Sequence, residues 1–160
     1  MNIFYLDEDP TTAAILQYNK HVVKMILESA QMLCTAHHEL LYDPEVPYKP
    51  AHINHPSTIW CRQNTRHYFW LYEHMLALGH EYTNRYGKEH LSVIKCKEPL
   101  RLAPINMPTY EFEQPPQCMP DEYKDPCSIQ AYWNYYIGEK HVVVNHNKEI
   151  LYEQRPQETY

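Results

Sequence analysis

The chain has 160 residues, of which 44% are hydrophobic and 21% are charged, and its formal net charge is −6. This composition excludes a disordered chain, and the length predicts one domain, residues 1–160, that needs no disulfide or metal to fold. The acidic balance argues against nonspecific binding along duplex DNA, which depends on neutralising many phosphates, but it does not exclude a local basic groove.

Neither secretion nor membrane insertion is expected. No stretch approaches the 18 or so consecutive apolar residues of a membrane span, and the start, MNIFYLDEDP, lacks the basic region of a signal peptide. The cysteines number five, an odd count without a C-x-x-C pair. Reduced thiols are the simplest account of that pattern, so we expect a cytoplasmic protein.

The first elements in chain order are a short apolar start and two helices. Residues 2–6 predict either an edge strand or an extended arm. Asp9 and Pro10 are typical of a helix start, where the missing N–H of proline does no harm. Residues 20–39 predict the clearest helix, because at the helical period their apolar side chains fall on one broad side and their polar ones on the other.

A loop and a second long helix are expected next. Residues 42–56 carry four prolines and predict a loop. The amphipathic segment 58–85 predicts one long helix, with Gly87 as its stop signal. Residues 88–97 add a short helix.

The last part of the chain predicts a wrapped loop and a final helix. Residues 98–127 contain seven prolines, and their tyrosine, phenylalanine and methionine content indicates an ordered loop around the body. Ser128 is expected to cap a helix that runs to about residue 147, and residues 152–160 to fray. The predicted fold class is therefore all-α, a compact bundle of three main helices with short helices and a Pro-rich loop.

The first candidate site is a polar stripe on the helix 20–39. Spacings of three and four place Lys20, Lys24 and Glu28 on one face, and His21 lies beside them. An ordinary solvated face with an ion pair between Lys24 and Glu28 is one interpretation. The other is a cleft, because the apolar arc of this helix is wide and a charged stripe on a central helix needs a cavity to face.

Cations and a histidine pair follow the first loop. His52 and His55 could hold a metal, but no fourth ligand is evident, so we expect no metal and read His55 as part of a binding surface. Arg62 and Arg66 lie one turn apart and could meet a phosphate, or could form an exposed basic turn.

Two further groups could contact a nucleotide. Arg85 and Lys88 concentrate positive charge at a helix end, where cations also complement the helix dipole. The aromatic run 132–136 covers too much of a helix circumference to face inward entirely, so Tyr132, Tyr135 or Tyr136 could stack on a base. Packing under the Pro-rich loop is the alternative for these rings.

No phosphate-binding loop, dinucleotide fingerprint or nucleophile elbow is present, and we expect no cofactor. The motifs that do stand out are long ones: D-x-D-P near the start, N-K-H-V-V-K-M-I-L-E-S-A-Q-M-L-C-T-A-H on the first long helix, N-H-P-S, E-Y-T-N-R-Y-G-K-E-H, M-P-D-E-Y-K and A-Y-W-N-Y-Y-I-G-E-K. They resemble a widespread family of small phage-encoded proteins, over nearly the whole chain. The layout is similar to that of the phage pyrimidine-dimer DNA glycosylases, small all-α enzymes.

That second similarity implies an amine that attacks the sugar and a helical glutamate that assists, which would be Glu28. The glycosylases use the N-terminal amine of a small second residue, whereas the second residue here is Asn2, so Lys20 or Lys24 would supply the amine.

Two functions of different classes follow. The first is a phage enzyme in the host cytoplasm that acts on a nucleotide or on a base in DNA, for modification or repair. Glu28, His21 and Lys24 would be catalytic, and the other cations, His55 and the tyrosines would bind substrate. The second is a non-catalytic counter-defence protein that sequesters a nucleotide-like host signalling molecule. Both functions need a cationic, tyrosine-lined pocket, which a third alternative, a structural or interaction protein, would lack. A homo-oligomer is compatible with each of these three functions.

Overall fold

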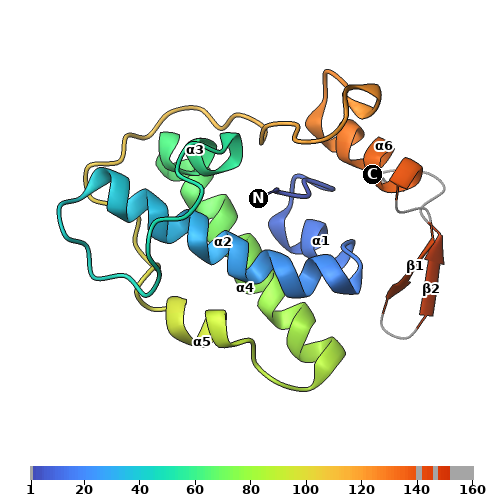
Figure 1. Cartoon of the computed structure of the whole chain (residues 1–160), viewed down its shortest axis with the longest axis horizontal. Coiled ribbons are helices and arrows are strands. Elements are labelled where there is room, and N and C mark those ends of the chain that lie inside the picture. The colour runs from blue at the N-terminus through green and yellow to red at the C-terminus, as the bar shows by residue number, and fades with distance from the viewer. Residues whose placement is uncertain (1, 140–141, 146–147, 152–160) are drawn as a thin grey trace.

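The computed structural model describes residues 2–139 with their side chains and the backbone of residues 142–145 and 148–151. The described helices pack together into an all-α body (Figure 1), which confirms the predicted fold class. The helices are α1 (Pro10–Ile15), α2 (Asn19–Leu40), α3 (Pro56–Gln63), α4 (Thr65–Tyr86), α5 (Leu91–Cys96) and α6 (Ser128–Glu139), with a 3-10 turn η1 (Asp121–Tyr123) and the strands β1 (Val142–Asn145) and β2 (Lys148–Leu151).

Helices α2 and α4 form the centre of the body. α4 packs against α1 and α2, while α2 also packs against α3 and α5. The inner face of α2 is completely buried at Val22, Ile26 and Leu33. The expected helix 20–39 is therefore confirmed, as is the helix start at Asp9, whose carboxylate accepts a hydrogen bond from the Thr12 backbone N–H at 2.8 Å.

The N-terminal residues form an extended arm, which decides between the two expectations for this segment. Ile3, Tyr5 and Leu6 are almost completely buried, although residues 2–6 join no strand. The Leu6 carbonyl accepts a hydrogen bond from the indole of Trp133 on α6 at 2.8 Å. The arm is thus one of the segments through which α6 joins the body.

The predicted single helix 58–85 is wrong, because the structure divides it at Asn64 into α3 and α4. The Asn64 backbone is extended, with φ −159° and ψ 165°. Its side-chain oxygen accepts the N–H groups of Arg66 and His67, which have no partner inside α4. Asparagine is among the best residues for this cap, so the local break is stable.

The predicted last helix is too long and its cap is misassigned. α6 ends at Glu139, and the valine-rich residues 142–145 form β1, which pairs antiparallel with β2. β-branched residues favour strands, which explains the change of structure. Ser128 is the first residue of α6, where its hydroxyl donates to the Pro115 carbonyl at 2.9 Å instead of capping the helix. The tail 152–160 lies outside the described residues.

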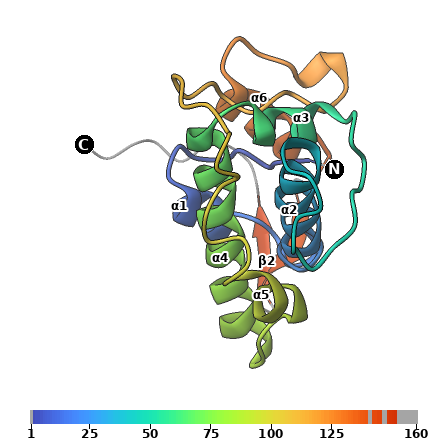
Figure 2. The same cartoon turned by 90° about the vertical axis from the view of Figure 1, so that its left-hand side faces the viewer.

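The Pro-rich segment runs as an ordered loop from α5 past α3 to α6 (Figures 1 and 2). Backbone carbonyls of this loop accept hydrogen bonds from buried aromatic side chains of the helices. The Trp60 indole donates to the Glu113 carbonyl at 2.8 Å, and the Tyr68 hydroxyl donates to the Leu100 carbonyl at 2.8 Å. The predicted wrapping loop is therefore observed.

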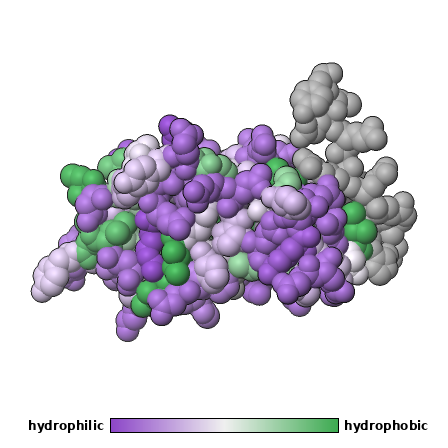
Figure 3. Space-filling model, turned by 90° about the horizontal axis from the view of Figure 1, so that it is seen from above, coloured by the Kyte–Doolittle hydropathy of each residue, from purple (hydrophilic) through white to green (hydrophobic). Residues whose placement is uncertain are grey.

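The surface is predominantly polar on the face that Figure 3 presents, with small apolar areas between hydrophilic side chains. Among the helices that the structure describes, none is long and apolar enough to cross a bilayer.

Gly79 allows α5 to approach α4 closely. A Cβ atom at this position would lie 2.7 Å from Cγ2 of Val93. We expect Gly79→Ala to lower the free energy of unfolding by about 1–3 kcal/mol, the usual cost of overpacking. Urea denaturation measures this loss. Adding Val93→Ala removes the clashing methyl group and should restore part of the lost stability. If the losses of the two single variants simply add in the double variant, the steric explanation is contradicted.

Candidate functional site

A polar pocket lies beside the first turns of α2. Its volume is about 390 Å³, near the lower end of the usual range for small-molecule sites, which is about 300–1,000 Å³. Its wall combines the N-terminal arm, α2, the start of α3, the Pro-rich segment and α6. The residues that line it are Asn2, Phe4, Tyr18, Lys20, His21, Lys24, His55, Cys118 and Tyr135. We call it the α2 pocket.

His21 is the most constrained group of the α2 pocket. Its ring stacks on Phe4, with 3.7 Å between centroids and 18° between planes. Its Nε2 lies 2.9 Å from the Tyr18 hydroxyl and its Nδ1 lies 2.7 Å from the Tyr136 hydroxyl. A neutral imidazole has one N–H donor and one acceptor, so the proton positions on Tyr18, His21 and Tyr136 are coupled.

Of the two tyrosines that flank His21, Tyr18 is the one that lines the pocket. Burial, and to a smaller degree Tyr135, raises the pKa of its hydroxyl above the usual value of 10. The hydroxyl therefore keeps its proton at neutral pH. It can donate that proton to a ligand while accepting a hydrogen bond from Nε2 of His21.

Lys20 and Lys24 give the pocket its positive charge. Both side chains are exposed, and no carboxylate is among the lining residues. Glu28 stands one turn further along α2, with its carboxylate 3.8 Å from the Lys24 ammonium. The ion pair of the solvated-face interpretation is thus present, and Lys24 lines the pocket as well. Glu28 is not among the lining residues, but its charge acts on Lys24 and His55, which are.

His55 contributes a neutral donor. Its Nδ1 accepts the Ser57 backbone N–H at 3.1 Å and so caps α3, which leaves the proton of the neutral ring on Nε2. Burial and the neighbouring His52 lower the pKa of His55, while Glu28 acts in the opposite direction. A second proton would have to sit on Nδ1 and would break the cap.

Asn2, Cys118 and Tyr135 complete the wall. The Asn2 amide donates to the Cys118 carbonyl at 2.9 Å, and its oxygen accepts from the Tyr132 hydroxyl at 2.6 Å. Cys118 places its Sγ 3.6 Å from the Ser57 hydroxyl. Tyr135 is half-buried and packs beside Tyr123, so one side of its ring remains available to the pocket.

The structure brings together five of the residues predicted from the sequence, namely Lys20, His21, Lys24, His55 and Tyr135. None of the predicted arginines lines the pocket, so the expectation that they bind substrate there beside Lys24 is wrong. Arg62 donates to the Ile53 carbonyl at 2.8 Å and holds the preceding loop. Arg66 is exposed and lies 3.7 Å from Glu111.

Arg85 and Lys88 are also outside the pocket. The Arg85 guanidinium is buried, pairs with Glu81 at 3.1 Å and donates to the backbone carbonyls of Gln17 and Ile15. Lys88 is exposed just after Gly87, which ends α4 with a φ of 73°. A guanidinium has five donors that suit several carbonyls at once, which is why Arg85 serves as a clamp between α4 and the α1–α2 junction.

Tyr132 and Tyr136 are completely buried, so their predicted role as stacking platforms is wrong. The Tyr132 hydroxyl reaches the Pro116 carbonyl at 2.7 Å, and burial raises its pKa. Tyr136 holds His21. The Pro-rich loop and the arm cover this side of α6, and that packing leaves Tyr135 as the ring of the three that faces the pocket.

The sequence interpretation missed Asn2, Phe4, Tyr18 and Cys118. Tyr18 had a usable signal, because it stands three residues before His21 at a helix start and i,i+3 neighbours meet. For Asn2, Phe4 and Cys118 no local signal exists, since they reach the pocket from separate segments of the chain.

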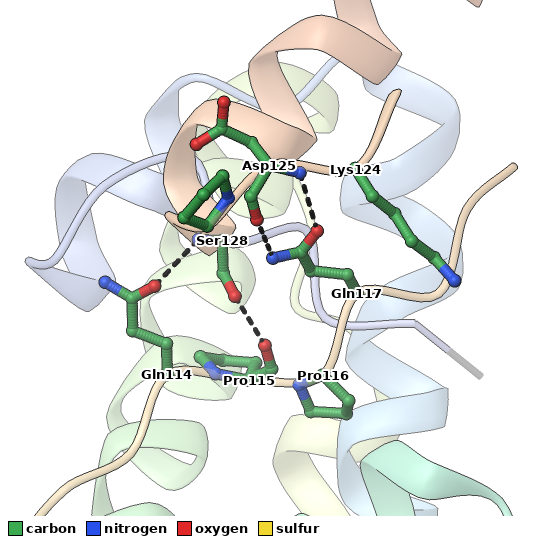
Figure 4. A pocket seen from close by; sticks show the side chains of 8 residues that line it. Gln114, Pro115, Pro116, Gln117, Lys124, Asp125 and Ser128 are labelled. Carbon is green, nitrogen blue, oxygen red and sulfur yellow. Dashed lines mark hydrogen bonds between the residues drawn. The ribbon is translucent and has the colours of Figure 1, made fainter. Parts of the chain in front are cut away.

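A larger cavity of about 650 Å³ lies between the Pro-rich segment and the start of α6 (Figure 4). Its polar side chains mainly bind the loop itself. Gln114 accepts from the Ser128 backbone N–H at 2.7 Å, and Gln117 accepts from that of Asp125 at 3.0 Å. We therefore take the α2 pocket as the candidate site.

Within the part of the chain that the structure describes, no group of three or more metal-ligating side chains is close enough to hold an ion. All five cysteines are free thiols. No family model matches the chain, and neither curated proteins nor solved structures give a match.

Proposed function

We propose that the protein is an enzyme that acts on a nucleotide or on a base in DNA, and that the reaction takes place in the α2 pocket. The observation that carries the proposal is the meeting of two lysines, two histidines and two tyrosines, from α2, α6 and the caps of α2 and α3, in a pocket without a lining carboxylate. Such a wall suits an anionic ligand with an aromatic part.

Each group has a role in this proposal. Lys20 and Lys24 hold phosphate, and Tyr135 stacks on the base. Tyr18 donates its proton to the reacting group, the hydrogen bond from Nε2 of His21 stabilises the phenolate that remains, and solvent entering the pocket returns the proton. Glu28 positions Lys24, so the catalytic role that the sequence suggested for Glu28 passes to Tyr18.

Sequestration of a nucleotide-like molecule is the second candidate. Both ring nitrogens of His21 already lie within hydrogen-bonding distance of tyrosine hydroxyls. This arrangement favours a rigid binding wall over a base that must accept a proton directly. From the motif resemblance we also propose a phage origin and a place in the host cytoplasm, with which the free thiols agree.

Incubation with ribonucleotides, deoxynucleotides and DNA oligonucleotides, followed by mass spectrometry, tests the proposal. We expect a product of altered mass, and we expect Tyr18→Phe to reduce its rate about 100-fold or more, as loss of general acid catalysis does. The phenyl ring keeps the packing, so binding should change little. Lys95→Ala, at an exposed lysine on α5, is the matched control.

Retention of an unchanged ligand without any product would support sequestration and reject the enzyme. Absence of both product and bound ligand would reject the two candidates together. An unchanged rate in Tyr18→Phe would reject the assigned proton donor.

A further inference from the structure

The charge of the α2 pocket matches one phosphate group. Its lining contains two ammonium groups, Lys20 and Lys24, and the neutral donors Tyr18 and His55. A terminal phosphate monoester carries a charge of about −1.5 to −2 at neutral pH, because its second pKa is about 6. A phosphodiester inside a strand carries a single negative charge. Two lysines therefore complement a terminal phosphate better than an internal one.

Among the residues whose side chains the structure describes, no cation other than Lys20 and Lys24 lines the pocket. Four of them lie within ion-pair distance of carboxylates or bind a carbonyl: Arg62, Arg66, Arg101 and Lys124. Arg85 is buried in its clamp. Lys95 and Lys97 belong to the α5 region, which lies opposite α6 in both views of the molecule (Figures 1 and 2). A protein that binds a single strand needs a positive groove along the backbone.

The surface next to the Tyr135 wall is acidic. Tyr135 packs beside Tyr123 of η1, and the Tyr123 hydroxyl donates to Glu139 at 3.2 Å. Asp121, Glu122 and Glu139 are all exposed here. A strand leaving the pocket past Tyr135 would meet these described carboxylates, which repel its phosphates.

From these three observations we propose that the ligand of the α2 pocket is a free mononucleotide with a terminal phosphate, and not a nucleotide within DNA. The inference rests on the proposed function and narrows its substrate class. The pocket volume of about 390 Å³ agrees with a single small ligand.

Calorimetric titration at fixed ionic strength tests the proposal. The probes are the ribo- and deoxynucleoside 5′-monophosphates, the corresponding nucleosides and a single-stranded decamer of mixed sequence without terminal phosphates. We expect at least one mononucleotide to bind about 10-fold or more tightly than its nucleoside, since two charge-assisted contacts are lost with the phosphate. The same mononucleotide should bind more tightly than the decamer.

Two variants connect the effect to the pocket. Lys24→Ala should remove most of the preference for the mononucleotide over the nucleoside. Lys20→Ala should do the same without depriving Glu28 of its ion pair, so a folding defect in the first variant does not decide the result. Lys95→Ala should bind as the parent protein does.

The outcomes separate this inference from the proposed function. If the decamer binds more tightly than every mononucleotide and Lys20→Ala weakens it, the free-mononucleotide inference is overturned and action on a base in DNA is retained. If nucleosides bind as tightly as mononucleotides, the inference that the pocket recognises a terminal phosphate is overturned. If no probe binds, the inference and the proposed function fall together.

Discussion

Arg85→Ala is expected to lower the free energy of unfolding by about 3–5 kcal/mol, the range found when one partner of a buried ion pair is removed. The Arg85 side chain is only 4% exposed and its guanidinium lies 3.1 Å from Glu81. It also donates to the Gln17 carbonyl at 2.8 Å and the Ile15 carbonyl at 3.1 Å. The alanine variant leaves these acceptors without their charged donor, and α4 loses one of its links to the α1–α2 junction.

Denaturant unfolding, with the slope m compared between variants, measures the loss. The matched control is Arg66→Ala, which removes an arginine from the same helix. That arginine is more than half exposed and its partner Glu111 is almost fully exposed, so we expect a change within about 0.5 kcal/mol. Equal losses in the two variants would refute the role of Arg85 as a buried clamp.

Acid is expected to destabilise the protein between pH 6.5 and pH 4 through His74. Burial lowers the pKa of this histidine from 6.5 to about 4. Its Nδ1 donates to the Pro10 carbonyl at 2.9 Å and its Nε2 accepts from the Gln17 amide at 3.0 Å, so protonation breaks the second bond. A depressed pKa contributes stability that is fully present above the unfolded value and is lost as the pH falls towards the folded value.

The difference in pKa corresponds to a contribution of about 3 kcal/mol from His74. Burial also lowers the pKa of His37 and His67, which adds to the loss in the same direction. Urea unfolding at several pH values from 7.5 to 5 measures the slope before most carboxylates titrate. We expect His74→Gln to flatten the slope, whereas His80→Gln, at an exposed histidine of the same helix, should keep it. A parent-like slope in His74→Gln would contradict the assignment.

The candidate site could be predicted in part because one of its segments is local. Lys20, His21 and Lys24 share the first turns of a single helix, so their spacing already places them together. His55 and Tyr135 come from α3 and α6, and their chemistry alone suggested a binding role. The arginines could not be assigned in this way, because a free arginine and a structural one look the same in a sequence.

The boundaries of the helices and strands could likewise be predicted only where they depend on neighbouring residues. The periodicity of residues 20–39 and the cap at Asp9 are properties of neighbouring residues, and they determined α2 and the start of α1. The break at Asn64 is also local, but the apolar period continues across it, so only the backbone geometry of Asn64 separates α3 from α4. Pairing between β1 and β2, in which Val142 lies opposite Leu151, explains why residues 142–145 form a strand and do not extend the last helix.

By itself, therefore, the sequence determined the helical class and the polar face of α2, because both depend on spacings of a few residues. The tertiary structure decided which side chains that face would meet. Asn2 reaches Tyr132 across 130 positions, and His21 reaches Tyr136 across 115. Contacts of this separation depend on how the arm, the Pro-rich loop and α6 fill the remaining space around α2, and no local pattern records that packing.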